Sequence, residues 1–271
     1  MANCDGNCEN CNVEGCGERI VKSKPNEFSN IKRIIGVLSG KGGVGKSFVT
    51  SSIAAYLNRN GFKVGILDAD ITGPSIPKAF GVKEKAYGEN GLIYPCKTAG
   101  GIEVMSANLL LEDEKEPIIW RGPLLGNLVK QFFEQVMWGE LDVLLIDMPP
   151  GTGDVALTTF QSLPIDDLII VTSPQDLVSL IVTKAIKMAE MMNIHVLGVV
   201  ENMSYLVCPK CEEKIPLFGE SHLEDFAKEM KFNILGKLPL NSDNTALMDK
   251  GEIEKISLPE MQSIIDAIKG E

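Results

Sequence analysis

The order of apolar and polar positions along the chain predicts buried strands separated by amphipathic helices. Short runs that are apolar throughout are typical of strands buried on both faces of a parallel sheet, and apolar positions three and four residues apart are typical of helices. The runs that predict strands are Ile31–Ser39, Phe62–Asp70, Leu141–Pro149, Asp167–Pro174, Ile194–Asn202 and Phe232–Leu240. The stretches that predict helices are Ser47–Gly61, Gly122–Gln135, Val178–Met192 and Ser221–Glu229.

This alternation predicts an α/β fold with a doubly wound, mostly parallel sheet and helices on both of its faces. The predicted domain spans residues 31–271, and Gly81–Met105 is interpreted as an insert of short strands that is open to antiparallel pairing. Residues 1–30 have no periodic apolar positions and are rich in Asn, Gly, Glu and Lys. They are predicted to form a flexible tail that orders only around a metal.

Composition and charge narrow the class of protein. The 271 residues are 44% hydrophobic and 23% charged, as in ordinary globular proteins, and the net charge of −11 argues against non-specific binding to nucleic acid or anionic membranes. The N-terminus lacks the basic and apolar regions of a secretory signal, and no run of about 18 uncharged apolar residues predicts a membrane span. We therefore expect a cytoplasmic protein, in which seven cysteines indicate metal or redox chemistry rather than structural disulfides.

The strongest motif is GKGGVGKS, which fits G-x-x-x-x-G-K-[ST] and lies between a predicted strand and a predicted helix, as a P-loop must. Glycines in this loop let backbone N–H groups surround phosphates, and the helix directs its positive end at them. Lys46 is predicted to contact the β- and γ-phosphates, and the Ser47 hydroxyl to coordinate Mg²⁺. The residues expected to bind nucleotide here are Gly40, Lys41, Gly42, Gly43, Val44, Gly45, Lys46 and Ser47.

Acidic residues at two strand ends complete the predicted nucleotide site. Asp68 and Asp70 follow one strand and therefore lie at the carboxyl edge of the sheet, where ligands gather. Asp147 ends another strand and is predicted to be a Walker B acid that binds Mg²⁺ through water, and the MPPGTGD that follows it could sense the γ-phosphate. A helix cap or a turn is the plainer interpretation of Asp70 and Asp147.

Lys41 is a second lysine inside the loop, and phosphates bound by the same chain do not need it. It is either a solvated charge or a cation directed at a nucleotide bound by a second copy of the chain, in the manner of an arginine finger. The second interpretation requires a dimer.

These motifs resemble those of the deviant Walker A ATPases, whose loop has the pattern [KR]-G-G-x-G-K-[ST]. The group, which is SIMIBI and MinD-like, includes ParA and MinD partitioning proteins, nitrogenase iron protein, arsenite ATPases and the Mrp/ApbC iron–sulfur carriers. Over about residues 30–260 the chain resembles the Mrp/ApbC/Nbp-type carriers in particular. The motifs that carry this resemblance are GKGGVGKS, DADITGPSIP, WRGP, IDMPPGTGD, TSPQD and ENMS followed by CPKC.

The resemblance implies roles for individual residues. Lys41 would contact the partner subunit's nucleotide in an ATP-sandwich homodimer, and Asp70 would polarise the attacking water or hold the Mg²⁺ shell. Asn202 would read adenine, for which an Asx turn is the plainer alternative. The catalytic residues that we expect are Lys41, Lys46, Asp70 and Asp147.

Cys208 and Cys211 form a C-x-x-C pair, which is half of a tetrahedral metal site. If ATP joins two chains face to face, four thiolates meet on the two-fold axis and complete a Cys₄ shell for a bridging [4Fe–4S] cluster. A zinc ion shared by two chains and a thioredoxin-like dithiol are the alternatives. Cys96 stands alone and is predicted to be a buried small hydrophobic residue.

Four more cysteines lie in the first sixteen residues and are enough for a Cys₄ shell within one chain. Family members with an N-terminal four-cysteine cluster motif have a longer first spacing, so an iron–sulfur cluster, zinc and no metal all stay open for this tail. The four candidate ligands are Cys4, Cys8, Cys11 and Cys16.

Together these features lead us to expect an ATP hydrolase that uses ATP and Mg²⁺, works as a homodimer and transfers [4Fe–4S] clusters to apo-proteins. Neither nucleic acid nor a membrane is an expected partner. The alternatives are a ParA/MinD-type positioning ATPase and an ATP-dependent electron donor like nitrogenase iron protein. The C-terminal ISLPEMQSIIDAIKGE lacks the basic face of the MinD membrane helix. The MPPGTGD segment after Asp147, which resembles switch II of the family, lacks the cysteine of nitrogenase iron protein.

Overall fold

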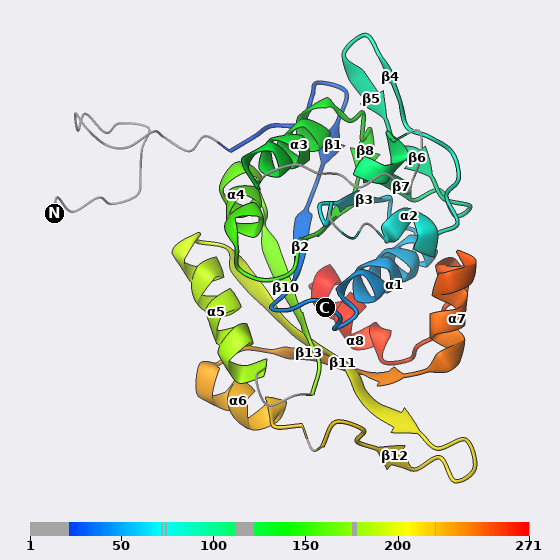
Figure 1. The fold of residues 1–271 in the computed structure, drawn as a ribbon, viewed down its shortest axis with the longest axis vertical. Coiled ribbons are helices and arrows are strands. Elements are labelled where there is room, and N and C mark those ends of the chain that lie inside the picture. Colours follow the sequence, from blue (N-terminus) through cyan, green and yellow to red (C-terminus); the bar gives the residue numbers. More distant parts are fainter. Residues whose placement is uncertain are drawn as a thin grey trace, which may run out of the picture.

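The computed structural model describes residues 22–71, 73, 75–111, 122–174, 178–219 and 221–270. Its centre is a nine-stranded sheet, which Figure 1 shows between two groups of helices. The strand order is β12 (Lys214–Ile215), β11 (His195–Val207), β10 (Asp167–Thr172), β2 (Ile34–Ser39), β9 (Val143–Asp147), β3 (Val64–Asp68), β7 (Glu103–Ser106) and β6 (Cys96–Lys97), with β13 (Ile234–Leu240) also paired to β11.

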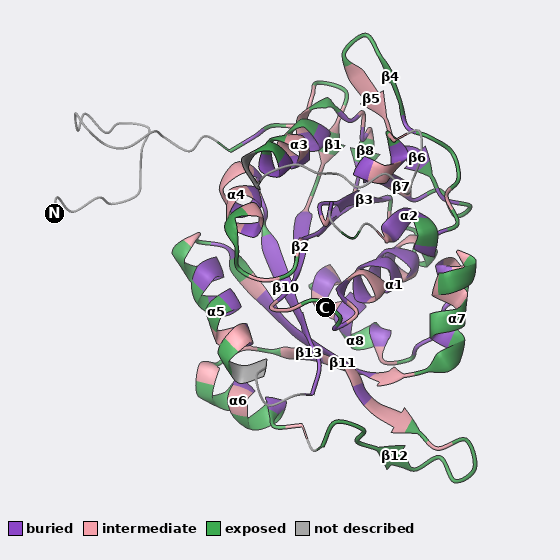
Figure 2. Cartoon of the chain, viewed as in Figure 1, coloured by how far each residue is buried: buried purple, intermediate pink, exposed green. Residues whose placement is uncertain are grey.

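All pairings inside this sheet are parallel except those of the edge strands β12 and β6. The expected doubly wound, mostly parallel fold is therefore confirmed. Every residue of β2, β3, β9 and β10 is buried, because helices cover both faces of these strands and leave no solvated side. Figure 2 shows this buried centre and the more exposed outer end of β11.

One group of helices packs around α1 (Lys46–Arg59), and the other covers the opposite face of the sheet (Figure 1). The first group contains α2 (Ile76–Ala79), α7 (Ser242–Lys250), α8 (Met261–Lys269) and a 3-10 turn at Ile253–Lys255. The second contains α3 (Gly122–Gln135), α4 (Asp154–Ser162), α5 (Val178–Met191) and α6 (Leu223–Met230). None of the helices among the described residues is long and apolar enough to cross a membrane.

The insert that the sequence predicted divides into two parts. The strands β4 (Tyr87–Glu89) and β5 (Leu92–Tyr94) form a separate antiparallel hairpin, whereas β7 joins the main sheet in parallel with β3 and leads into a 3-10 turn at Ala107–Leu109. A further short pair joins β1 (Asn30–Ile31) to β8 (Glu140–Leu141).

The end of the predicted tail is attached to the domain. The Ser23 amide donates to the Ser162 carbonyl at 2.7 Å, and the Lys22 ammonium donates to the Leu163 carbonyl at 2.9 Å. The side-chain amide of Asn26 donates to the Val136 carbonyl at 2.7 Å. The four tail cysteines lie outside the described residues.

The prediction that the strand beginning near Ile194 ends at Asn202 is wrong, because β11 continues to Val207. The register with β13 shifts between Glu201 and Tyr205, and Met203 within this interval has φ 57°. A bulge of this kind lets a strand continue after a local change of direction. The hydrophobic pattern is interrupted at the bulge, so the sequence predicted that the strand ends there.

Candidate functional site

The P-loop lies between the end of β2 and the start of α1, and two of its glycines have a steric reason to be glycine. Gly45 has φ 80°, and a Cβ on it would lie 2.2 Å from Nδ2 of Asn202. A Cβ on Gly40 would lie 1.4 Å from Cγ2 of Ile181 on α5. Any larger residue would displace the loop, whose N–H groups precede the positive end of α1.

Lys46 and Ser47, in the first turn of α1, are both held by the acid at the end of β9. The Nζ atom of Lys46 lies 2.7 Å from Oδ2 of Asp147 and 3.6 Å from Oδ2 of Asp70. The hydroxyl groups of Ser47 and Thr50 donate to the two oxygens of Asp147 at 2.6 and 2.7 Å. Thr50, which lies one turn after Lys46, was not predicted from the sequence to be part of the site.

This arrangement fits a magnesium ion. Mg²⁺ prefers oxygen ligands, and P-loop NTPases hold it with the P-loop hydroxyl and a Walker B carboxylate. The predicted ligand Ser47 and the acid Asp147 are in direct contact at 2.6 Å. The residues present therefore supply the hydroxyl and the carboxylate that such a site needs.

Asp68 lies beneath the pocket, next to Asp147 in the register of β3 with β9. It accepts hydrogen bonds from the Asp70 amide and from the Ser106 hydroxyl, both at 3.2 Å. Burial, followed by the charge of Asp147, raises the pKa of Asp68 to about 8. The two acids of the DAD motif thus differ, because Asp68 is buried with a raised pKa whereas Asp70 lines the pocket.

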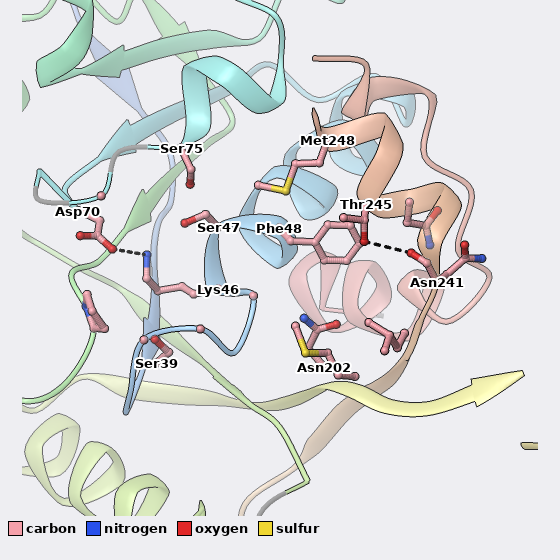
Figure 3. A pocket seen from close by; sticks show the side chains of 18 of the residues that line it. Ser39, Lys46, Ser47, Phe48, Asp70, Ser75, Asn202, Asn241, Thr245 and Met248 are labelled. Atoms are coloured by element: carbon pink, nitrogen blue, oxygen red, sulfur yellow. Dashed lines mark hydrogen bonds and ion pairs between the residues drawn. The ribbon is translucent and has the colours of Figure 1, made fainter. Parts of the chain in front are cut away.

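A cavity of about 370 Å³ extends from the P-loop to α7 (Figure 3). Figure 3 shows Lys46 and Asp70 on one side of it and Thr245, Met248 and Asn202 on the other. The lining at the P-loop end consists of Ser39, Gly42, Gly43, Gly45, Lys46, Ser47, Phe48, Asp70, Gly73, Ser75 and Pro150. The lining at the far end consists of Asn202, Met203, Pro239, Leu240, Asn241, Asn244, Thr245 and Met248.

Most of the far-end residues come from β13 and α7, and the sequence analysis missed them. The available signal was the position of Asn241, directly after the last predicted strand, where ligands of parallel sheets gather. Asn241 caps α7 by accepting a hydrogen bond from the Asp243 amide at 2.7 Å.

Two residues with predicted nucleotide roles lie differently with respect to this cavity. Asn202 is buried in its wall, and its Nδ2 donates to the carbonyl of Val44 in the P-loop at 2.9 Å. Lys41 is not among the described residues that line the cavity, and its carbonyl accepts from the Ser39 hydroxyl at 3.0 Å. The structure therefore places Asn202 at this chain's pocket and Lys41 outside its lining.

Cys208 and Cys211 lie in the turn between β11 and β12, at the end of the sheet that extends away from the body in Figure 1. The Glu212 amide donates to the Cys208 carbonyl at 2.9 Å, which closes the turn. The backbone N–H groups of Lys210 and Cys211, and then the Cys211 thiol, lower the pKa of Cys208. A lowered pKa favours the thiolate, the form that binds metals.

The cysteine pair has no further metal ligand beside it in the described part of the chain, where no group of three or more His, Cys, Asp or Glu is placed to hold a metal. Four exposed apolar residues lie on β11, on β12 and directly after β12: Val207, Ile215, Leu217 and Phe218. We call these four residues the hairpin patch. Cys96 is buried, as predicted, and burial raises the pKa of its thiol.

Comparisons with known proteins identify the family to which the chain is similar. A family model described as ParA, NUBPL iron-transfer P-loop NTPase, matches residues 30–269. An iron–sulfur cluster carrier protein of Clostridium perfringens is 47% identical over 249 residues, which cover 89% of this chain and 87% of the relative. A protein of the same name from Methanocaldococcus jannaschii is 48% identical over 262 residues, 93% of this chain and 90% of the relative.

Solved structures give the same picture of the fold. A nucleotide-binding protein of Archaeoglobus fulgidus in complex with ADP is 44% identical, with a TM-score of 0.76 over 85% of this chain and 90% of that one. The cell division ATPase MinD of Pyrococcus furiosus is 21% identical, with a TM-score of 0.64 over 88% of this chain and 99% of that one. The second likeness concerns the fold alone.

Proposed function

The chain belongs to the NUBPL iron-transfer P-loop NTPase family, and from this premise we propose that it is an ATP-dependent carrier of iron–sulfur clusters. It hydrolyses ATP, holds a [4Fe–4S] cluster between two copies of the chain and passes it to apo-proteins in the cytoplasm. One observation carries the proposal: β11 lines the nucleotide pocket with Asn202 and ends at Val207, directly before Cys208. The strand thereby joins the two sites directly.

The P-loop end of the cavity binds the phosphates of ATP. Lys46 exchanges its contacts with Asp147 and Asp70 for the β- and γ-phosphate oxygens, which carry more negative charge. Ser47, and Asp147 through water, would hold a Mg²⁺ ion, which would supply positive charge to the same phosphates. Asp70, at the pocket wall, orients the attacking water.

Two further groups complete hydrolysis. Lys41 lies outside its own chain's pocket lining, so it acts on the nucleotide of the partner subunit. Switch II follows β9 directly, where Pro150 lines the pocket and the Gly151 amide donates to the Ser39 carbonyl at 2.7 Å. Exchange of that hydrogen bond for the γ-phosphate would report the nucleotide state to α4, which starts three residues later.

The cluster is cargo, and its ligands come from two chains. One chain offers two thiolates at the end of β11, whereas a cubane cluster takes four. A second copy related by a two-fold axis supplies the missing pair. The hairpin patch supports this arrangement, because exposed apolar side chains on the same segment as an incomplete ligand set are suited to burial against the same surface of a partner.

No specific observation favours the two alternatives, a ParA/MinD-type positioning ATPase and an ATP-dependent electron donor. The likeness to MinD rests on the fold, and the net charge of −11 argues against the DNA or anionic-membrane binding that positioning on a surface would need. The four tail cysteines are proposed as a second metal site of open identity.

The test is anaerobic cluster reconstitution in a full-length background in which the four tail cysteines are replaced by serine. We expect about four iron and four sulfide per dimer, as one cubane requires, and loss of both in Cys208→Ser and in Cys211→Ser. Cys96→Ser is the matched control, because Cys96 is buried in β6, at the opposite edge of the sheet from β12, and its replacement should leave loading unchanged. A fully loaded monomer, or zinc in place of iron, would contradict the proposal.

A further inference from the structure

Glu201 is a buried acid on β11, directly before Asn202, and its side chain is only 2% exposed. Its Oε1 accepts a hydrogen bond from the Ser221 hydroxyl at 2.6 Å, and its Oε2 accepts one from the Ser204 hydroxyl at 2.5 Å. The ammonium of Lys237, its register partner on β13, lies 3.9 Å from Oε2. Both carboxylate oxygens therefore have the partners that burial of such a group requires.

The two serines lie on either side of the segment that carries the cysteine pair. Ser204 belongs to the part of β11 that leads to Cys208, and Ser221 follows the hairpin patch in the chain. The Ser221 hydroxyl also accepts from the amide of Leu223, the first residue of α6, at 3.3 Å. Figure 1 shows the β11–β12 hairpin between these two attachments extending away from the body. One carboxylate thus fastens both ends of the segment that bears the cysteines.

The same residue adjoins the nucleotide pocket. Its neighbour Asn202 lines the pocket and donates from Nδ2 to the Val44 carbonyl in the P-loop at 2.9 Å. A shift of the P-loop at Val44 would therefore reach Glu201 through one hydrogen bond and one peptide unit. Continuous hydrogen-bond networks of this kind can carry coupling between two sites.

A carboxyl group at this buried position is not needed for packing, because well-packed apolar residues often replace buried ionic groups without loss of stability. An apolar side chain would not specify where Ser204 and Ser221 lie, whereas two hydrogen bonds to one carboxylate do. We propose that Glu201 is a positioning residue, which holds the cysteine hairpin relative to the nucleotide pocket and transmits nucleotide binding to Cys208 and Cys211. This inference rests on the proposed function, because it takes the cavity as the nucleotide site and the two cysteines as the cluster ligands.

The experiment uses the metal-free, full-length chain with Cys96 and the four tail cysteines replaced by serine, which leaves Cys208 and Cys211 as its only thiols. It is kept at a concentration at which sedimentation velocity shows a monomer, so that dimer formation does not cover the pair. The rate of alkylation by iodoacetamide is measured with and without Mg-ADP. We expect Mg-ADP to change this rate by about fivefold or more, the lower end of typical coupling between sites.

In Ser221→Ala the effect of Mg-ADP should fall below about twofold, while the dissociation constant of ADP stays within about twofold of the parent value. Ser221→Thr keeps the hydroxyl and should restore the response. Glu201→Leu removes both attachments from the other side and should also abolish it. Glu224→Gln is the matched control, because Glu224 contacts Lys237 at 2.6 Å from an exposed position on α6, and it should respond like the parent.

A full response in Ser221→Ala, or an alkylation rate in the parent chain that Mg-ADP leaves unchanged, would overturn the inference. The second comparison needs no variant, so it applies even if a substitution impairs folding. Failure of the proposed function is distinct, because it would appear as a chain that binds no ADP or that takes up no cluster during reconstitution.

Discussion

The ammonium of Lys46 and the carboxylate of Asp147 form a buried ion pair at 2.7 Å, which joins the first turn of α1 to the end of β9. The pair has two consequences, one for stability and one for nucleotide binding. Removal of one partner leaves the other charge buried and uncompensated.

We therefore expect Lys46→Ala to lower the free energy of unfolding by about 3–5 kcal/mol and ATP turnover by roughly 100-fold or more. The double variant Lys46→Ala with Asp147→Asn should be less destabilised than the sum of the two single variants, because both charges are then absent. Urea denaturation and a phosphate-release assay measure the two effects. Normal hydrolysis by Lys46→Ala would remove the P-loop from the mechanism.

Substitution of Lys41 should lower ATP turnover and leave the affinity for ATP almost unchanged. Because Lys41 lies outside the lining of its own chain's cavity, Lys41→Ala should keep its affinity for ATP within about twofold while turnover falls by about 1000-fold, the scale of a catalytic finger. Equilibrium titration and turnover at several protein concentrations give both numbers. A large loss of affinity in monomeric protein would show instead that Lys41 serves its own nucleotide.

Asp68 should make the stability of the protein depend on pH. Its pKa is about 8 in the folded chain and near the ordinary value of 3.8 in the unfolded chain, so between these values the folded state holds a proton that the unfolded state has lost. Stability then falls as pH rises from about 4 to 8, by up to about 1.4 kcal/mol per pH unit for this group alone.

The variant Asp68→Asn keeps the shape and has no charge to lose. Its stability relative to the wild type should rise through the same pH range and level off above about pH 8. Thermal unfolding without nucleotide or Mg²⁺ measures the difference. A constant offset between the two proteins from pH 4 to 8 would show that Asp68 is ionised throughout.

The hairpin patch should contribute to the stability of the dimer and not to the folding stability of the monomer. Phe218 is 44% exposed, so Phe218→Glu should leave the melting temperature of the monomer within about 2 °C while it weakens the cluster-bearing dimer by at least about tenfold. Sedimentation velocity under anaerobic conditions measures the dimer. Met191, 82% exposed on α5, provides the control Met191→Glu, which should leave the dimer intact.

Much of the local structure and chemistry could be predicted from the sequence, because the signals are local. The helix Gly122–Gln135 has the bounds that its apolar spacing predicts, and the buried strand ending at Asp147 was recognised from one continuous apolar run. The P-loop could be recognised from its own eight residues and from the strand and the helix predicted on either side of it. The spacing of the C-x-x-C pair likewise predicted half of a metal site.

Other features depended on contacts between distant segments. The sequence could not show that β11 passes its bulge and reaches the cysteines, because that continuation depends on pairing with β13 and β12. It could not assign Asn244 to the pocket, since α7 reaches the P-loop only through packing of the whole sheet.

The raised pKa of Asp68 shows most clearly which properties depend on the tertiary structure rather than on the sequence alone. The sequence placed two identical carboxyl groups two residues apart at one strand end, and it offered no reason to distinguish them. Register places Asp68 beside Asp147 and beneath the surface, whereas Asp70 reaches the cavity. Residue types and their spacing in the sequence therefore determined which functional groups lie close together along the chain. Burial and the distance between charges, which decide the ionisation of a group, exist only once remote strands are side by side.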